Sequence, residues 1–226
     1  MFYYHASNIE VRNPQWNYRK PDKLKETRDF GEGFYTSVDN REYPVYLYSQ
    51  YDKIKLNRYT LDNNGLSELI LGIDLKWLLI TAFHRSSFSK RPKYHFIRDA
   101  IRAYISGFDL VTGLISNDRF YSTIDAFIAG GATDFVSIEI VKMMEFGTQT
   151  VSKSHKADAQ FRFIGSEDVR LDEIQRCREE RAQHKNDMED LVARKRIELQ
   201  PHDNGKFFLQ ILEEIEEHGI NAWLRK

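Results

Sequence analysis

The 226-residue sequence has a single cysteine, Cys177, which excludes an internal disulfide. Its 33 lysines and arginines nearly balance 34 aspartates and glutamates, so no excess of positive charge indicates nucleic acid or an anionic membrane as a partner. No apolar run approaches the ~20 residues that span a bilayer, and the N-terminus lacks the segments of a signal peptide. We therefore expect a cytoplasmic protein, with Cys177 on the surface of a charged helix.

The common phosphate-binding and metal-binding patterns are also missing. Gly31-Glu32-Gly33 is too short for the dinucleotide fingerprint of parallel α/β folds, and the sequence contains no Gly-Lys-Ser/Thr element. The histidines lack the spacing of metal ligands, so we expect no metal site. No Gly-x-Ser-x-Gly elbow supports serine catalysis. A dinucleotide that binds this chain must use another fold.

The chain does contain enough apolar material for a packed core, with 41% hydrophobic and 13% aromatic residues. Its composition changes near residue 165, because 26 of the 61 residues from Ser166 to Lys226 are charged. We expect a globular domain over residues 1–165 and a charged helical extension over residues 166–226.

Hydrophobic periodicity in the first 165 residues predicts strands and helices that alternate irregularly, which indicates an α+β fold. The predicted strands cover residues 2–5, 33–37, 54–61, 108–115, 148–152 and 160–164. The predicted helices cover residues 75–82, 91–105, 117–129 and 133–146.

The extension is predicted to form two helices. Phe208, Ile211, Leu212 and Ile215 follow the spacing of one helix face. Residues 171–199 show weaker periodicity, which fits a helix that packs one edge on the body, a helix that pairs with another chain, or a solvated surface helix.

Three segments together carry a family resemblance: Tyr3-Tyr4-His5-Ala6-Ser7, Asp29-Phe30-Gly31-Glu32-Gly33-Phe34-Tyr35-Thr36-Ser37, and residues 109–118. They resemble an uncharacterised bacterial family with Tyr-His-Gly-Ser and Asp-Phe-Gly-x-Gly-Phe-Tyr motifs. That family is related to the ADP-ribosyltransferases of the diphtheria-toxin and poly-ADP-ribose-polymerase type. The resemblance implies a split antiparallel β-sheet core with flanking helices over residues 1–165, and NAD as the substrate.

The resemblance also implies which residues bind NAD. A histidine can hydrogen-bond a ribose hydroxyl, and a tyrosine can stack on nicotinamide, which are the roles expected for His5 and Tyr35. The small residue after the histidine, Ala6 here and Gly in the family, presents its backbone to the carboxamide. The full set of expected cofactor-binding residues is His5, Ala6, Ser7, Gly33, Tyr35, Arg85 and Asn117.

Catalysis in the related enzymes uses a glutamate that opens a late strand, where this chain has Gln149. Glutamine keeps the hydrogen bond to ribose but lacks the charge that stabilises an oxocarbenium-like state. Asp118 is either a replacement acid or a helix cap. Arg85 either pairs with Asp109 or faces the pyrophosphate. The expected catalytic residues are His5, Tyr35, Gln149 and Asp118.

The resulting prediction is a mono-ADP-ribosyltransferase that transfers ADP-ribose from NAD to a protein or nucleic acid. Enzymes of this kind in bacteria act as toxins, effectors or anti-phage factors, so the resemblance also implies a neutralising partner protein. The alternatives are a non-catalytic module that binds NAD or ADP-ribose, and an adaptor that assembles through its charged extension.

Overall fold

The computed structural model describes residues 1–17, 28–85, 92–115, 118–143 and 147–224. Seven strands form one sheet in the order β4-β5-β6-β2-β1-β3-β7, and every neighbouring pair is antiparallel except β4 and β5. The strands are β1 (Tyr3–Ser7), β2 (Phe34–Val38), β3 (Lys55–Leu61), β4 (Glu68–Ile70), β5 (Leu110–Leu114), β6 (Thr148–Ser152) and β7 (Phe161–Asp168).

The helices include every helix predicted from periodicity and three that were not predicted, α1, α6 and α9. They are α1 (Glu42–Tyr48), α2 (Leu75–Arg85), α3 (His95–Ser106), α4 (Asp118–Ile128), α5 (Asp134–Lys142), α6 (His155–Gln160), α7 (Leu171–Leu199), α8 (Phe208–His218) and α9 (Asn221–Leu224). The mixed α and β content and the mainly antiparallel sheet confirm the predicted fold class. In the described residues, no helix is both long and apolar enough to cross a membrane.

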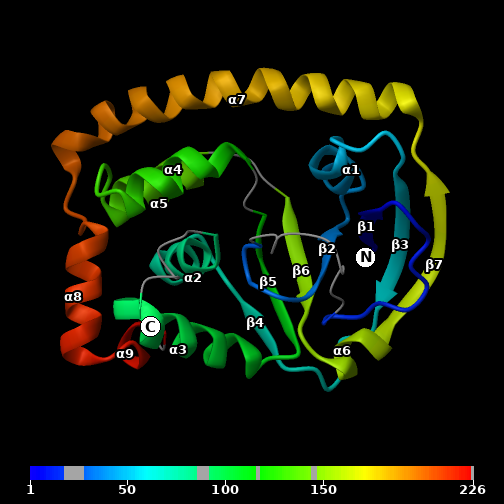
Figure 1. Cartoon of the computed structure of the whole chain (residues 1–226), viewed down its shortest axis with the longest axis horizontal. Helices are drawn as coiled ribbons and strands as arrows, with labels where there is room; N and C mark the ends of the chain where they lie inside the picture. Colours follow the sequence, from blue (N-terminus) through cyan, green and yellow to red (C-terminus); the bar gives the residue numbers. More distant parts are fainter. Residues whose placement is uncertain (18–27, 86–91, 116–117, 144–146, 225–226) are drawn as a thin grey trace.

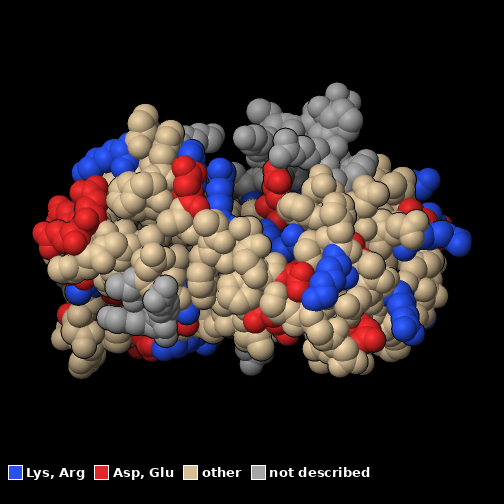
Figure 2. Space-filling model, turned by 90° about the horizontal axis from the view of Figure 1, so that it is seen from below, with Lys and Arg blue, Asp and Glu red and all other residues tan. Residues whose placement is uncertain are grey.

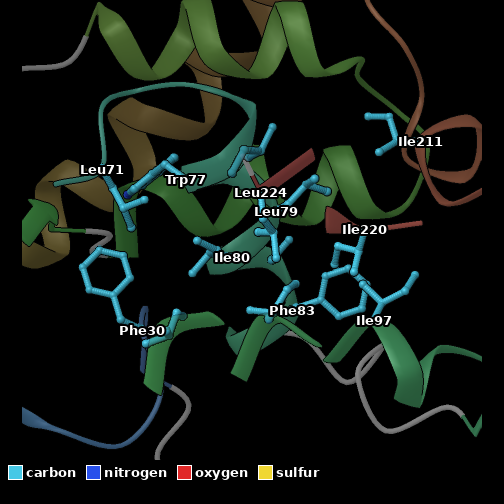
Figure 3. Packing of buried hydrophobic residues seen from close by; sticks show 14 of the residues in the cluster. Phe30, Leu71, Trp77, Leu79, Ile80, Phe83, Ile97, Ile211, Ile220 and Leu224 are labelled. Carbon is cyan, nitrogen blue, oxygen red and sulfur yellow. The ribbon is translucent and has the colours of Figure 1, made fainter. Parts of the chain in front are cut away.

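The largest core lies between strands β4, β5 and β6 and the helices gathered beside them in Figure 1. Figure 3 shows Trp77, Ile80 and Phe83 of α2 pointing into this core, with Phe30 at its edge toward the sheet. Trp77, Ile80 and Phe30 have no exposed surface. Burial of one such side chain stabilises the fold by about 1.5–3 kcal/mol, so this core fixes the central strands.

The opposite face of the sheet carries an aromatic cluster. The Phe34 ring meets the rings of Tyr59 and Phe161 edge-on, at centroid distances of 5.6 and 5.8 Å, and Tyr3 packs beside them. Edge-to-face rings contribute about 0.5–1.5 kcal/mol per pair beyond their burial. Because side chains alternate along a strand, Phe34 on this face places Tyr35 on the face of the helical core.

The extension from residue 166 packs on the body, which is the first of the three arrangements considered for it. Helix α7 crosses the whole molecule in Figure 1. Near its start, Ile174 packs with residues of α1 and β3, and near its end Val192 packs with residues of α5. Helix α8 then adds Phe208 and Ile211 to the largest core. The extension therefore shares its core with residues 1–165.

The surface position expected for Cys177 is wrong. Cys177 is only 4% exposed, because it lies on the face of α7 that packs against α1, next to Ile174. Burial raises the pKa of its thiol. The weak periodicity of α7 concealed this contact, since only a few residues of a long charged helix are covered.

Candidate functional site

Strands β1 and β2 are neighbours that pair only briefly. Their register contains two pairs, Tyr3 with Val38 and Tyr4 with Ser37. Beyond that point β1 stays paired with β3 through Ser7, while β2 stays paired with β6 through Phe34. The sheet is therefore interrupted between the end of β1 and the start of β2, which is where two of the three motif segments lie.

His5 reaches across this interruption. Its Nδ1 lies 2.8 Å from the carbonyl oxygen of Tyr35, so Nδ1 must carry a proton to make the bond. The His5 ring also packs on the Phe34 ring, at a centroid distance of 4.6 Å. The His5 side chain thus supplies a hydrogen bond between β1 and β2 where the backbone hydrogen bonds stop. Its ring lies on the sheet face that carries the aromatic cluster.

Tyr35 belongs to the other face and is fixed at its hydroxyl group. That hydroxyl donates to the carbonyl of Gly31 at 2.7 Å and accepts from the backbone N–H of Phe30 at 3.0 Å. The guanidinium carbon of Arg28 lies 5.1 Å from the ring centroid. His5 and Tyr35 are thus close, but strand alternation directs their rings to opposite faces of the sheet, so the two rings do not face each other across one ligand.

Gln149 lies on the same face as Tyr35. It is directly opposite Ser37 in the β2–β6 register and opposite Gly113 in the β5–β6 register, and Tyr35 is its diagonal neighbour on β2. Its Nε2 donates to Oδ2 of Asp29 at 2.7 Å and to the carbonyl of Leu114 at 3.1 Å. These two bonds use both amide protons, so Oε1 is fixed as the acceptor.

Ser37 adds an unsatisfied polar group beside Gln149. Its hydroxyl is buried and has no hydrogen-bond partner within the described part of the chain. Buried polar atoms are rarely left without a partner, and an ordered water commonly completes such a group. Gln149 and Ser37 are therefore two polar groups on one face, next to the interruption of the sheet.

The turn before Tyr35 is packed against the protein on both sides. A Cβ atom at Gly33 would lie 2.3 Å from Cγ1 of Val151, so this glycine is needed for the approach of the turn to β6. The ammonium group of Lys153 donates to the carbonyls of Phe30, at 2.8 Å, and Glu32. Burial lowers the pKa of Lys153 to about 8. Gly33 was predicted to contact NAD. In the structure its lack of a side chain allows the turn to pack against β6.

Ala6 and Ser7 were also predicted to contact NAD, and both side chains make contacts within the protein. Ala6 is buried among Val45, Tyr46 and Leu56, so its side chain contributes to the core under α1. The Ser7 hydroxyl donates to the carbonyl of Ile9 at 2.5 Å and accepts from Nδ2 of Asn57 at 3.1 Å. Ala6 shares the face of Gln149 but adds only a methyl group to it, and Ser7 lies on the other face.

The remaining predicted residues are only partly described. Asn117 lies outside the described residues, as do the side chains of Arg85, which ends α2, and Asp118, which begins α4.

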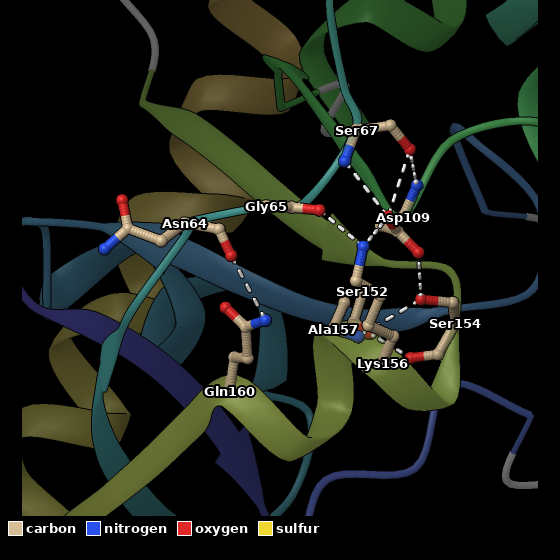
Figure 4. A network of polar contacts seen from close by, with 9 residues as sticks. All are labelled: Asn64, Gly65, Ser67, Asp109, Ser152, Ser154, Lys156, Ala157 and Gln160. Atoms are coloured by element: carbon tan, nitrogen blue, oxygen red, sulfur yellow. Dashed lines mark hydrogen bonds and ion pairs between the residues drawn. The ribbon is translucent and has the colours of Figure 1, made fainter.

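Asp109, which was considered as one possible partner of Arg85, accepts hydrogen bonds from other residues. Asp109 accepts from the backbone and hydroxyl of Ser67, from the Ser154 hydroxyl at 2.7 Å, and pairs with Lys156 (Figure 4). The hydrogen bonds from Ser154 and Ser67 lower its pKa to about 2. Asp109 therefore joins the start of β5 to the start of α6 through these described contacts, and whether Arg85 pairs with it lies outside the described side chains.

Two hollows elsewhere in the molecule do not suit a dinucleotide. One of about 40 Å³, lined by His84, Arg98 and Arg102, holds only about three waters. The other, of about 470 Å³, lies between the start of α2 and α5 and carries Asp74, Asp134 and Glu139 against Lys142. This excess of carboxylates opposes a pyrophosphate.

Charge on the molecular surface is mixed. On the face drawn in Figure 2, basic and acidic side chains are interspersed, and acidic side chains gather at the end of the molecule where α8 lies. Within the described residues, no three potential metal ligands converge.

Asp29 is the site residue that sequence reasoning missed. It is 3% exposed and touches Gln149 from a position 120 residues earlier in the chain. Its place at the start of Asp-Phe-Gly-x-Gly-Phe-Tyr was a signal, because the same segment supplied the predicted residues Gly33 and Tyr35.

A family model described as a protein of unknown function (DUF3990) matches residues 1–163. The match contains all three motif segments and every strand up to the first part of β7, and it ends before α7, α8 and α9. Comparisons with curated proteins and with solved structures gave no match.

Proposed function

Since the chain belongs to this family of unknown function, we propose its activity from the sheet interruption and the groups around it. The proposed function is mono-ADP-ribosyl transfer, with NAD⁺ as the substrate and a protein or nucleic acid as the acceptor. Under this proposal the nicotinamide end of NAD⁺ lies on the sheet face that carries Tyr35 and Gln149, beside the gap between β1 and β2.

One observation carries the proposal: Gln149, with both amide protons bonded, lies directly opposite Ser37, whose buried hydroxyl has no partner among the described residues, and diagonally opposite Tyr35. An amide oxygen accepts a hydrogen bond from a ribose hydroxyl, and a phenol ring stacks on the nicotinamide ring. Because the Tyr35 hydroxyl is hydrogen-bonded to both Gly31 and Phe30, the orientation of its ring is fixed, and nicotinamide would take the place of Arg28 over the ring.

The reaction proposed here breaks the bond between C1′ of ribose and the nicotinamide nitrogen. The electron pair of that bond leaves with nicotinamide, which becomes neutral. A lone pair of the acceptor forms the new bond to C1′, and the proton displaced from the acceptor passes to solvent. Gln149 orients the ribose during this exchange, which is a contribution from positioning.

A second candidate function is binding of NAD⁺ or ADP-ribose without turnover. The neutral amide of Gln149 favours it, because the related enzymes have a glutamate at this position. Both candidates use the same face, so a binding measurement alone does not separate them. Release of nicotinamide does, because only the transferase breaks the glycosidic bond.

The test is incubation of the full chain with NAD⁺ and chromatographic measurement of nicotinamide, with labelled ADP-ribose followed onto acceptors in cell extract. Gln149→Ala is expected to lower the release rate at least ten-fold. Gln175→Ala, at an exposed position of α7, is the matched control and is expected to leave the rate unchanged. If the wild-type protein binds NAD⁺ and releases no nicotinamide, the transferase proposal is wrong and the binding module remains.

The resemblance of the three motifs also supports a role as a toxin, effector or anti-phage factor held in check by a partner protein. Co-purification of the chain with proteins expressed from neighbouring genes is the direct measurement. A partner that abolishes nicotinamide release is the expected result, and a partner that leaves the rate unchanged contradicts this role.

A further inference from the structure

We infer that Asp29 supplies the negative charge that Gln149 lacks, so that the two side chains together favour a dinucleotide with an oxidised, cationic nicotinamide ring. The inference rests on the proposed function only for the location of the nicotinamide end. It assigns Asp29 as a positioning residue, because it acts on the substrate through Gln149.

The contact between the two side chains is short and buried. Oδ2 of Asp29 lies 2.7 Å from Nε2 of Gln149, and the two residues are 3% and 5% exposed. A carboxylate that accepts from an amide N–H polarises the amide group, which makes its oxygen a stronger acceptor. Because the second amide proton is bonded to the carbonyl of Leu114, the oxygen cannot exchange places with the nitrogen.

Asp29 is held in place by the residue that follows it. The backbone N–H of Phe30 donates to the Tyr35 hydroxyl, and its carbonyl accepts from Lys153. The Phe30 ring lies over Gly113, where an added Cβ would be 2.9 Å from Cζ of the ring. Gly113 is also directly opposite Gln149 in the sheet. One glycine therefore makes room for the segment that delivers the carboxylate.

The surrounding charges make Asp29 important for a cationic substrate. Two charged groups of this turn are cations and one is an anion: Arg28 lies over the Tyr35 ring, Lys153 is bonded to the turn, and Glu32 interacts with Lys153. Without Asp29, the described groups Arg28, Lys153 and Glu32 carry a net charge of about +1, which opposes a cationic ring. Burial strengthens the effect, because charges out of water are weakly screened.

The oxidised and reduced dinucleotides test this directly, because NAD⁺ carries the ring charge and NADH does not. The measurement is the pair of dissociation constants by calorimetry, for the wild-type chain and for Asp29→Asn. Asparagine keeps an acceptor oxygen for Nε2 and the size of the side chain, and it replaces the charged second oxygen by a neutral amide NH₂ group. The ratio of the NADH constant to the NAD⁺ constant is expected to fall about ten-fold in Asp29→Asn, or about 1.4 kcal/mol.

Asp62→Asn is the matched control. Asp62 lies in an exposed turn and accepts from the backbone N–H of Asn64 at 3.1 Å, a role that asparagine also fills, so the ratio is expected to stay at the wild-type value. Thermal unfolding of each variant shows whether it is folded. If Asp29→Asn is not folded, Asp29→Ser replaces it, because serine offers an acceptor oxygen in a smaller side chain.

The outcomes separate this inference from the proposed function. An unchanged ratio in the folded variant overturns the role of Asp29, as does an equal loss of affinity for both dinucleotides. Absence of turnover in a wild-type chain that shows the expected ratios overturns the transferase proposal and supports the inference. Absence of binding of either dinucleotide to the wild-type chain overturns both.

Discussion

Replacement of Gly33 by alanine tests how tightly the turn before Tyr35 is packed. A Cβ atom at this position would lie 2.3 Å from Cγ1 of Val151 and 2.8 Å from the carbonyl oxygen of Ser152. Carbon atoms prefer separations of about 3.5–4.0 Å, so the turn or β6 must move by more than about 1 Å. Neither movement is easy, because Val151 is fully buried and β6 is paired on both sides.

Such overpacking costs about 1–3 kcal/mol, and we expect the upper end because the second contact is with backbone. For a chain of this length, about 3 kcal/mol lowers the melting temperature by about 6–12 °C. Gly165→Ala in β7 is the matched control, because no atom lies within 4 Å of its added Cβ. It is expected to change stability by less than about 0.5 kcal/mol.

The assay is urea unfolding followed by tryptophan fluorescence, since Trp77 is fully buried in the largest core. Gly33→Ala should unfold at a clearly lower urea concentration than the wild type, with an unchanged slope. Displacement of the turn should also weaken NAD⁺ binding in the folded variant. A Gly33→Ala variant as stable as the wild type, or a Gly165→Ala variant equally destabilised, refutes the packing argument.

Three further predictions concern single side chains. Tyr35→Phe removes two hydrogen bonds and should cost about 1–3 kcal/mol in urea unfolding, together with weaker NAD⁺ binding; wild-type values for both would contradict the anchoring role. Burial lowers the pKa of His84 to about 4, so the unfolded chain takes up the proton first, and stability should fall by at most about 3 kcal/mol as pH drops from 6.5 to 4. His84→Gln should flatten that pH dependence, and an equally steep curve in the variant would count against it. Asp109→Asn should destabilise the chain by about 1–3 kcal/mol at pH 7, whereas Asp62→Asn should not, and equal stability of the two variants would show that the network in Figure 4 contributes little.

The central strands were predictable because their apolar and polar residues alternate or because they contain short apolar runs. Thr148–Ser152 was predicted with the bounds that β6 has, and Lys55–Leu61 differs from its prediction by one residue. The missed strand, β4, has three residues and leaves Ile70 exposed at the sheet edge. It forms because β5 offers a parallel partner, which no local pattern reveals.

Helix α1 was missed for a different reason. Its seven residues contain Pro44 and three tyrosines, so propensity does not favour a helix. Packing decides instead: Val45 and Tyr46 are buried against β1, β3 and α7. Tertiary contacts that are distant in sequence thus override a weak local preference.

The candidate site was predictable as separate residues and not as an arrangement. Motif spacing identified Tyr35 and Gln149, yet only the register places them as diagonal neighbours on one face. The same register directs His5 to the other face, a consequence of alternation once the pairing of β1 and β2 is known. Asp29 was missed because its partner Gln149 is 120 residues away.

Hydrogen–deuterium exchange of the wild-type chain, with and without NAD⁺, tests the central claim most directly because it locates the ligand. The claim predicts added protection in residues 28–37 and 147–152, the segments that surround Tyr35 and Gln149. Protection confined to residues 73–75 and 134–142, which line the 470 Å³ hollow, would place the dinucleotide elsewhere and contradict the account.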